Sequence, residues 1–182
     1  PYGSSTAIMI QKAFSTGEVM KLCKSYRSTY EITNFAQKIQ INNELSPVMR
    51  HGEYPTILRF NTPKDEISGI LELISTFQKS GYTSLGIICK TETLTQKLVT
   101  VLQTETNHIN FLSSQSSVFT KGIIITSAHI AKGLEFDEVI IPQVNDENYH
   151  SIIDKSMLYV AVTRAMHKLT LTYCNKQSEL IP

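Results

Sequence analysis

The sequence predicts an α/β fold of three layers, in which a mainly parallel sheet lies between helices. Two observations lead to this fold class. The runs Ile123–Ile125 and Val139–Ile141 are continuous and β-branched rather than alternating, as in strands that are buried on both faces. Strand-like segments also alternate with amphipathic helical segments along the chain, which is typical of parallel sheets with helical crossovers.

The composition sets limits on function. The chain has 182 residues, 41% of them hydrophobic and 18% charged, which suits one large globular domain. A net charge of +1 excludes a protein that coats nucleic acid in bulk, so any nucleic-acid contact is expected in a local groove. No apolar run approaches the ~20 residues of a membrane span, so we expect no membrane partner. Cys23, Cys89 and Cys174 stand singly, which favours reduced, buried thiols and a cytoplasmic location.

The first half of the chain predicts three strand–helix pairs. Residues 1–16 have no clear pattern, and the absence of an initiator Met at Pro1 suggests either a processed chain or an excised piece of a longer protein. The expected strands are 18–23, 56–60 and 85–89. Helices should follow from a capping box at Ser28 and Glu31, from the Thr62-Pro63 cap to Gly81, and over residues 94–102.

The second half predicts a loop or one short strand at 109–112, the two buried strands around Ile123–Ile125 and Val139–Ile141, a helix from Ser156 through Ala165, and a last strand at 169–173. Between the buried strands lies a short crossover rich in polar side chains. Ligands bind past the carboxyl ends of strands in open α/β sheets, so we expect the crossover to face such a site. The pair Asp146-Glu147 lies in a loop after Pro142 and is interpreted as solvated charges.

Three short motifs carry the chemistry. Tyr26-Arg27-Ser28 precedes a capped helix, and an aromatic ring with a guanidinium suits a purine with phosphates. His129-x-Ala131-Lys132-Gly133-Leu134-Glu135-Phe136 fills the crossover. Leu158 to Ala165 places Arg164 in an apolar context, where an arginine must face an anion, a carboxylate or solvent.

In this order, the three motifs resemble motifs IV, V and VI of the UvrD/Rep/PcrA helicases of superfamily one. The resemblance implies a RecA-like domain over residues 17–176, with 1–16 as a preceding segment and 177–182 as a tail. In this family the tyrosine stacks on adenine and the motif IV arginine approaches the terminal phosphate. The implied nucleotide-binding residues are Tyr26, Arg27, Gly133, Glu135 and Arg164, with Arg27 and Arg164 catalytic.

The same resemblance implies a path for single-stranded DNA along Lys90, Thr91, Ser127 and His129. Two features depart from the family. Ser25 replaces the usual Asn, and residues 104–122 are too few for the subdomain that larger relatives insert before motif V.

None of the 8 glycines is followed by Lys, so the chain has no Walker A loop for ATP phosphates and no hydroxyl placed for Mg²⁺. We therefore expect an N-terminal RecA-like domain of the same parent polypeptide to hold ATP and Mg²⁺, and the isolated chain to be inactive.

Two alternatives remain open from the sequence. One is a RecA-like module that binds nucleic acid or protein without ATPase chemistry. The other is a small-molecule α/β enzyme, although no catalytic triad, metal cluster or dinucleotide motif supports it. Taken singly, Arg164 could be a structural salt-bridge residue and His129 an ordinary surface histidine.

Overall fold

The computed structural model describes residues 24–41, 46–47, 49–106, 109–114 and 122–182, together with residues 9, 12 and 116. The expectations for residues 1–16 and for a strand at 18–23 lie outside the described residues, apart from residues 9 and 12. Cys23 also lies outside them, whereas Cys89 and Cys174 are free and buried, as predicted.

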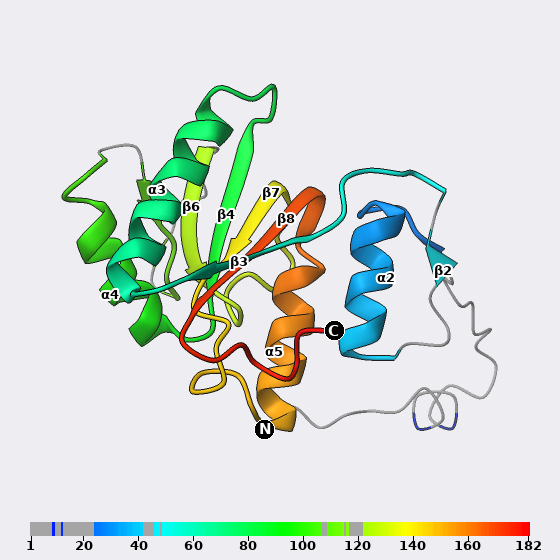
Figure 1. Ribbon diagram of the computed structural model, residues 1–182. Helices are drawn as coiled ribbons and strands as arrows, with labels where there is room; N and C mark the ends of the chain where they lie inside the picture. Colours follow the sequence, from blue (N-terminus) through cyan, green and yellow to red (C-terminus); the bar gives the residue numbers. More distant parts are fainter. Residues whose placement is uncertain are drawn as a thin grey trace.

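The central sheet is six-stranded and entirely parallel (Figure 1). Its order is β3 (Thr56–Phe60), β8 (Ala165–Cys174), β7 (Phe136–Ile141), β4 (Ser84–Cys89), β6 (Gly122–Ser127) and β5 (Ile109–Phe111). A separate two-stranded parallel sheet joins β1 (Lys24–Ser25) to β2 (Ser46–Pro47). The short β5 occupies the segment in which a short strand, and no inserted subdomain, was predicted.

Helices cover both faces of the sheet, which confirms the predicted three-layer fold. Helices α3 (Pro63–Gln78) and α4 (Glu92–Leu102) lie on one face, and α2 (Tyr30–Ile39) and α5 (Ile152–Val162) lie on the other (Figure 1). Ile123 and Ile125 pack in the core beneath α3 and α4, while Ile124 packs in the core beneath α2 and α5. Adjacent residues of one strand therefore enter different cores, which explains why the apolar runs are continuous.

Side-chain caps set the helix starts. Thr62 is the predicted N-cap of α3 and forms a capping box with Asp65, and Thr91 accepts a hydrogen bond from the Leu94 N–H at the start of α4. The predicted cap of α2 was wrong by one residue. Thr29 is the N-cap, and the Ser28 hydroxyl donates instead to the carbonyl of Ala165 at 2.6 Å. The Ser28 side chain therefore makes a tertiary contact with β8 rather than a helix cap.

The predicted boundary between α5 and the last strand was also wrong. Ser151 and Asp154 form a capping box, so α5 begins at Ile152 rather than at Ser156. Ala165 is not helical but opens β8, because the N–H of Phe136 in β7 bonds to the carbonyl of Arg164 at 3.0 Å. Arg164 thus lies between helix and strand rather than within the helix. Likewise, α3 ends at Gln78, before Gly81.

The crossover that follows β6 differs from the expected link between neighbouring strands. Strand β4 lies between β6 and β7 in the sheet, and pairs in parallel with both. Residues 128–135 contain turns and no helix, and they return the chain from the carboxyl end of β6 to the amino end of β7. The segment therefore begins where the strands have their carboxyl ends, which we call the carboxyl edge of the sheet. It ends where the strands have their amino ends, which we call the amino edge.

The C-terminal residues pack against the loop that follows β7. The Ser178 N–H donates to the carbonyl of Val144 at 3.2 Å, and Ile181 is part of the core beneath α2 and α5. In the same loop, Asp146 forms a salt bridge with Lys176 at 2.8 Å and Glu147 is exposed. Within the described ranges, no helix combines the length and apolar character needed to cross a bilayer.

Gly86 provides a test of the packing between β4 and β7. A Cβ at this position would lie 2.5 Å from Cδ2 and 2.7 Å from Cγ of Phe136. Gly86→Ala is expected to lower the free energy of unfolding by about 1–3 kcal/mol, because the buried ring has no space to move. Chemical denaturation would measure the loss.

Gly81→Ala is the matched control, since a Cβ at Gly81 meets nothing within 4 Å. Its effect is expected to stay within about 0.5 kcal/mol. Equal stabilities of the two variants would contradict the packing of Phe136 on Gly86.

Candidate functional site

The residues of motifs IV and V meet through an ion pair. Arg27 Nε donates a hydrogen bond to Glu135 Oε1, although the two residues are 108 positions apart in sequence. Their side chains are 38% and 43% exposed, so both remain accessible to a ligand. This contact fixes the position of the motif IV guanidinium relative to the start of β7.

Arg164 lies beside this pair, and its guanidinium is held by oxygen atoms of its own domain. Nε donates to the carbonyl of Val160 at 3.1 Å, Nη1 to the carbonyl of Leu134 at 3.2 Å, and Nη2 to Thr163 Oγ1 at 3.1 Å. These acceptors are neutral, so none of them compensates the positive charge of Arg164. Burial and the nearby charge of Arg27 lower the pKa of Arg164, whereas Glu135 acts in the opposite direction.

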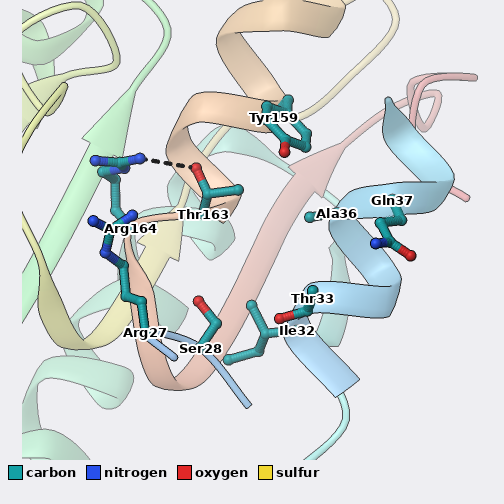
Figure 2. Close-up of a pocket in the computed structure, with 9 residues that line it drawn as sticks. All are labelled: Arg27, Ser28, Ile32, Thr33, Ala36, Gln37, Tyr159, Thr163 and Arg164. Atoms are coloured by element: carbon teal, nitrogen blue, oxygen red, sulfur yellow. Dashed lines mark hydrogen bonds between the residues drawn. The ribbon is translucent and has the colours of Figure 1, made fainter. Parts of the chain in front are cut away.

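A pocket of about 180 Å³ adjoins the two arginines (Figure 2). Helix α2 contributes one wall with Ile32, Thr33, Ala36 and Gln37, and the end of α5 contributes another with Tyr159 and Thr163. Arg27 and Arg164 lie together at one side of the pocket in Figure 2. Two guanidinium groups with a single carboxylate give this end of the pocket an excess of positive charge, which suits an anion.

The remaining predicted nucleotide-binding residues flank this group. Tyr26 precedes Arg27 directly and is 70% exposed, so its ring is free to stack on a planar ligand. Gly133 has φ +96°, a left-handed conformation that favours glycine, and it lies in the turn that leads to Glu135. The structure therefore brings Arg27, Glu135 and Arg164 together and places Tyr26 and Gly133 next to them in the chain.

The edge at which these residues gather differs from the expected one. Glu135 and Arg164 each precede the first residue of a strand, β7 and β8 respectively, so they lie at the amino edge of the sheet. The general rule for open α/β sheets had predicted the carboxyl edge. The crossover explains the difference, because it ends at the amino edge although it begins at the carboxyl edge.

The predicted DNA-contacting residues occupy the carboxyl edge. Ser127 ends β6, Lys90 and Thr91 follow β4, and His129 lies in the first turn of the crossover. The N–H of Ala128 donates to the carbonyl of Cys89 at 2.8 Å, which joins the ends of the two strands. His129 is exposed, whereas Ser127 is buried and the Thr91 side chain caps α4.

Lys90 is already engaged with the protein. Its Nζ forms a salt bridge of 2.5 Å with Asp154 Oδ1, donates to the carbonyl of Asn148, and lies 5.7 Å from the centre of the Tyr149 ring. Its side chain is only 18% exposed. In this structure, Lys90 joins the carboxyl end of β4 to the start of α5.

Sequence reasoning did not single out Asp154, which pairs with Lys90, or Arg50, which donates a hydrogen bond to the carbonyl of Arg27. Asp154 follows the N-cap Ser151 by three residues, and this capping spacing was the signal that could have marked it. Burial alone would raise the pKa of Asp154, but hydrogen bonds from Lys90 and from the N–H groups of Ser151 and His150 outweigh it and hold the pKa well below its usual range. Arg50 stands in a loop without a comparable signal.

The lowered pKa of Asp154 predicts a pH-dependent contribution to stability. Because the folded pKa is depressed, the contribution is present above the unfolded carboxyl pKa of about 3.9 and is lost as the pH falls through the folded pKa. Asp154→Asn is expected to lose about 2–3 kcal/mol at pH 7, because a cap and a buried ion pair are both weakened. The difference from wild type should shrink as the pH falls below 4.

Urea denaturation at pH 7 and pH 3 would measure this difference, with Asp146→Asn as a control. Asp146 pairs with Lys176, whose side chain is 65% exposed, so its loss should cost less than about 1 kcal/mol. A constant difference between wild type and Asp154→Asn across this pH range would rule out an ionised Asp154.

Comparison with known proteins points to a helicase C-terminal domain. Residues 107–176 match the family model of the UvrD-like helicase C-terminal domain, a range that includes motifs V and VI but not Tyr26 and Arg27. The chain matches none of the curated protein sequences with which it was compared.

Among solved structures, the chain is similar to the C-terminal domain of a possible DNA helicase from Lactobacillus plantarum WCFS1. That pair shares 27% identity with a TM-score of 0.74, over 86% of this chain and 92% of the other. Arterivirus nonstructural protein 10, a helicase solved with DNA and without it, is 12% identical in both cases. The TM-scores are 0.45 and 0.44, over 65% and 69% of this chain but 28% and 31% of the viral chains.

The viral similarity is too low to establish a shared fold. By contrast, the family model covers two of the three motifs, and the bacterial domain matches over most of both chains. The resemblance predicted from the sequence is therefore confirmed: residues 107–176 match the UvrD-like helicase C-terminal domain, and the chain is similar over most of its length to the C-terminal domain of a possible DNA helicase.

Proposed function

We propose that this chain is the second motor domain of an ATP-dependent DNA helicase and completes an ATP site built mainly by an N-terminal RecA-like domain of the same polypeptide. One observation carries the proposal. Arg27, Glu135 and Arg164 come from three distant segments and meet at one edge of the sheet, beside a pocket. A scaffold gains little from placing two arginines side by side, because their charges repel each other.

The roles of these residues follow from their chemistry. The exposed ring of Tyr26 would stack on adenine, and the guanidinium of Arg27 would exchange Glu135 for the terminal phosphate. Arg164 would stabilise the charge that develops on the phosphoryl oxygens, once it turns from the carbonyls that hold it now. Gly133 allows the turn that presents Glu135 to the nucleotide.

ATP and Mg²⁺ need further ligands from the partner domain. The described residues include no cluster of three or more His, Cys, Asp or Glu side chains that could hold a metal ion. The residues around Arg27 and Arg164 suit a purine ring and the negative charge of phosphates, but they do not suit Mg²⁺. We therefore assign Mg²⁺ and the main phosphate contacts to the N-terminal domain, and expect the isolated chain to bind ATP weakly without hydrolysing it.

The carboxyl edge is proposed to contribute to a path for single-stranded DNA. His129 is exposed there, with Ser127 and Thr91 nearby in the fold. Lys90 could bind a phosphate only by giving up part of its contact with Asp154. We place the helicase in the cytoplasm, where single cysteines remain reduced.

The surface of α5 supports docking of the N-terminal domain. Ile152 is 85% exposed and Ile153 is 68% exposed. Ile153 also lines a mainly apolar groove with Met157 and Val160 of the same helix and with His129 of the crossover. Exposed aliphatic side chains beside functional residues are typical of an interface rather than of open solvent.

A binding module without ATPase chemistry remains the competing proposal, because the hydrogen bonds of Arg164 are those of a structural residue as well. Arg164→Ala in the full-length parent distinguishes the two functions. For a motor domain, the DNA-stimulated ATPase rate should fall by about 10³–10⁵-fold, while much of the DNA affinity remains. Arg164→Lys should restore little, because an ammonium lacks the fork geometry of guanidinium.

The control is Arg59→Ala, which removes an exposed arginine from the edge strand β3. Its ATPase rate should match that of wild type. If Arg164→Ala lowered the melting temperature but left turnover per folded molecule intact, Arg164 would be structural and the motor function would be withdrawn.

His129 allows an independent test of the DNA path. Crosslinking of the full-length protein to single-stranded oligothymidylate should mark peptides around His129. His129→Ala should weaken DNA binding by about 5–150-fold, the range expected when one stacking contact is lost. His167→Ala is the matched control, because His167 lies near the amino end of β8, whereas His129 follows the carboxyl end of β6. Adducts confined to other segments would contradict this path.

A further inference from the structure

The loop residues Arg50, His51 and Gly52 contact the backbone of motif IV and the start of α2. The proposed function assigns no role to them. Arg50 Nη2 donates to the carbonyl of Arg27 and, at 3.0 Å, to the carbonyl of Met166 in β8. The carbonyl of Arg50 in turn accepts the N–H of Tyr30 at 2.8 Å. A single residue thus joins the backbone on both sides of Ser28 to the first residues of β8.

Two neighbouring contacts hold the loop against α2. His51 Nδ1 lies 2.8 Å from Glu31 Oε1, and the Gly52 N–H donates to Glu31 Oε2 at 2.8 Å. A Cβ at Gly52 would lie 2.6 Å from Cγ2 of Thr29, the N-cap of α2, so the loop approaches the helix start as closely as a glycine allows. The loop is therefore packed against the start of α2, directly after motif IV.

Arginine is a costly residue for this position if stability alone is required. Among the described residues, Arg50 Nε is one of two buried side-chain nitrogen or oxygen atoms that lack a hydrogen-bond partner. An apolar side chain of similar length would fill the space without burying an unpaired N–H group. What it could not supply is the pair of hydrogen bonds from Nη2 to the carbonyls of Arg27 and Met166.

We propose that Arg50 is a positioning residue for the nucleotide site: it fixes the backbone of Arg27 against β8, so that the Arg27 side chain is aimed at Glu135 and at the terminal phosphate. This inference rests on the proposed function. The backbone sets the direction of a side chain, and a displacement of about 1 Å at a catalytic group can cost about 10²-fold in rate. Arg50 itself touches neither substrate nor reacting atoms.

The main test is a double-mutant cycle in the full-length helicase. Arg50→Lys keeps the charge and most of the volume but removes the planar donor that spans two carbonyls. It should lower kcat of the DNA-stimulated ATPase by about 10–100-fold. In an Arg27→Ala background the same change should cost less than about twofold, because its effect passes through Arg27. An equal loss in both backgrounds would overturn the proposal.

A second readout does not depend on ATP. The N–H groups of Thr29 and Tyr30 donate to the carbonyls of Met166 and Arg50, so their hydrogen exchange reports how firmly motif IV is held. Exchange at both should be at least about tenfold faster in Arg50→Lys, while exchange in β4 and β7 stays unchanged. Unchanged exchange at Thr29 and Tyr30 would also overturn the proposal.

Arg59→Lys is the matched control, since Arg59 is an exposed arginine outside this loop and should affect neither readout. The two readouts separate the two hypotheses. If the motor function is wrong but Arg50 does hold the backbone of motif IV, Arg27→Ala keeps the ATPase turnover of wild type. Arg50→Lys then still accelerates hydrogen exchange at Thr29 and Tyr30. If only the positioning role is wrong, Arg27→Ala loses turnover while Arg50→Lys alters neither rate.

Discussion

The parallel pairing of β7 with β8 is the constraint on which the rest of this site depends. Phe136 is in register with Ala165, and the N–H of Phe136 donates to the carbonyl of Arg164. The residues just before the two strands, Glu135 and Arg164, are therefore placed next to each other at the amino edge of the sheet. Because β7 and β8 lie inside the sheet, with covered faces on both sides, this register cannot slip without exposing core residues.

Charge balance at this edge explains why the site suits an anion. Arg27 is paired with Glu135, whereas Arg164 is held by neutral oxygens, so one positive charge remains without a carboxylate partner. The close approach of the two guanidinium groups is unfavourable on its own, and an anionic ligand between them would remove the repulsion. The same arrangement carries a modest electrostatic cost that the binding of an anion can relieve.

Helix α5 connects this edge with the opposite one. Its start is fixed at the carboxyl edge by the Asp154–Lys90 ion pair, and its end leads through Thr163 to Arg164 at the amino edge. Helix α5 thus runs from the edge of the proposed DNA path to the edge of the proposed ATP site.

Much of the fold, and the choice of candidate site residues, followed from the sequence alone, for a local reason. Continuous β-branched runs such as Ile123–Ile125, helical periodicity and the Thr62-Pro63 cap are short-range patterns, and the three motifs lie in short stretches of chain. Only the tertiary structure decided that Ser28 bonds to β8 instead of capping α2, that Arg164 stands between helix and strand, and that its edge is the amino one. Strand order and hydrogen bonds between residues more than 100 positions apart determine these features, and no local pattern encodes them.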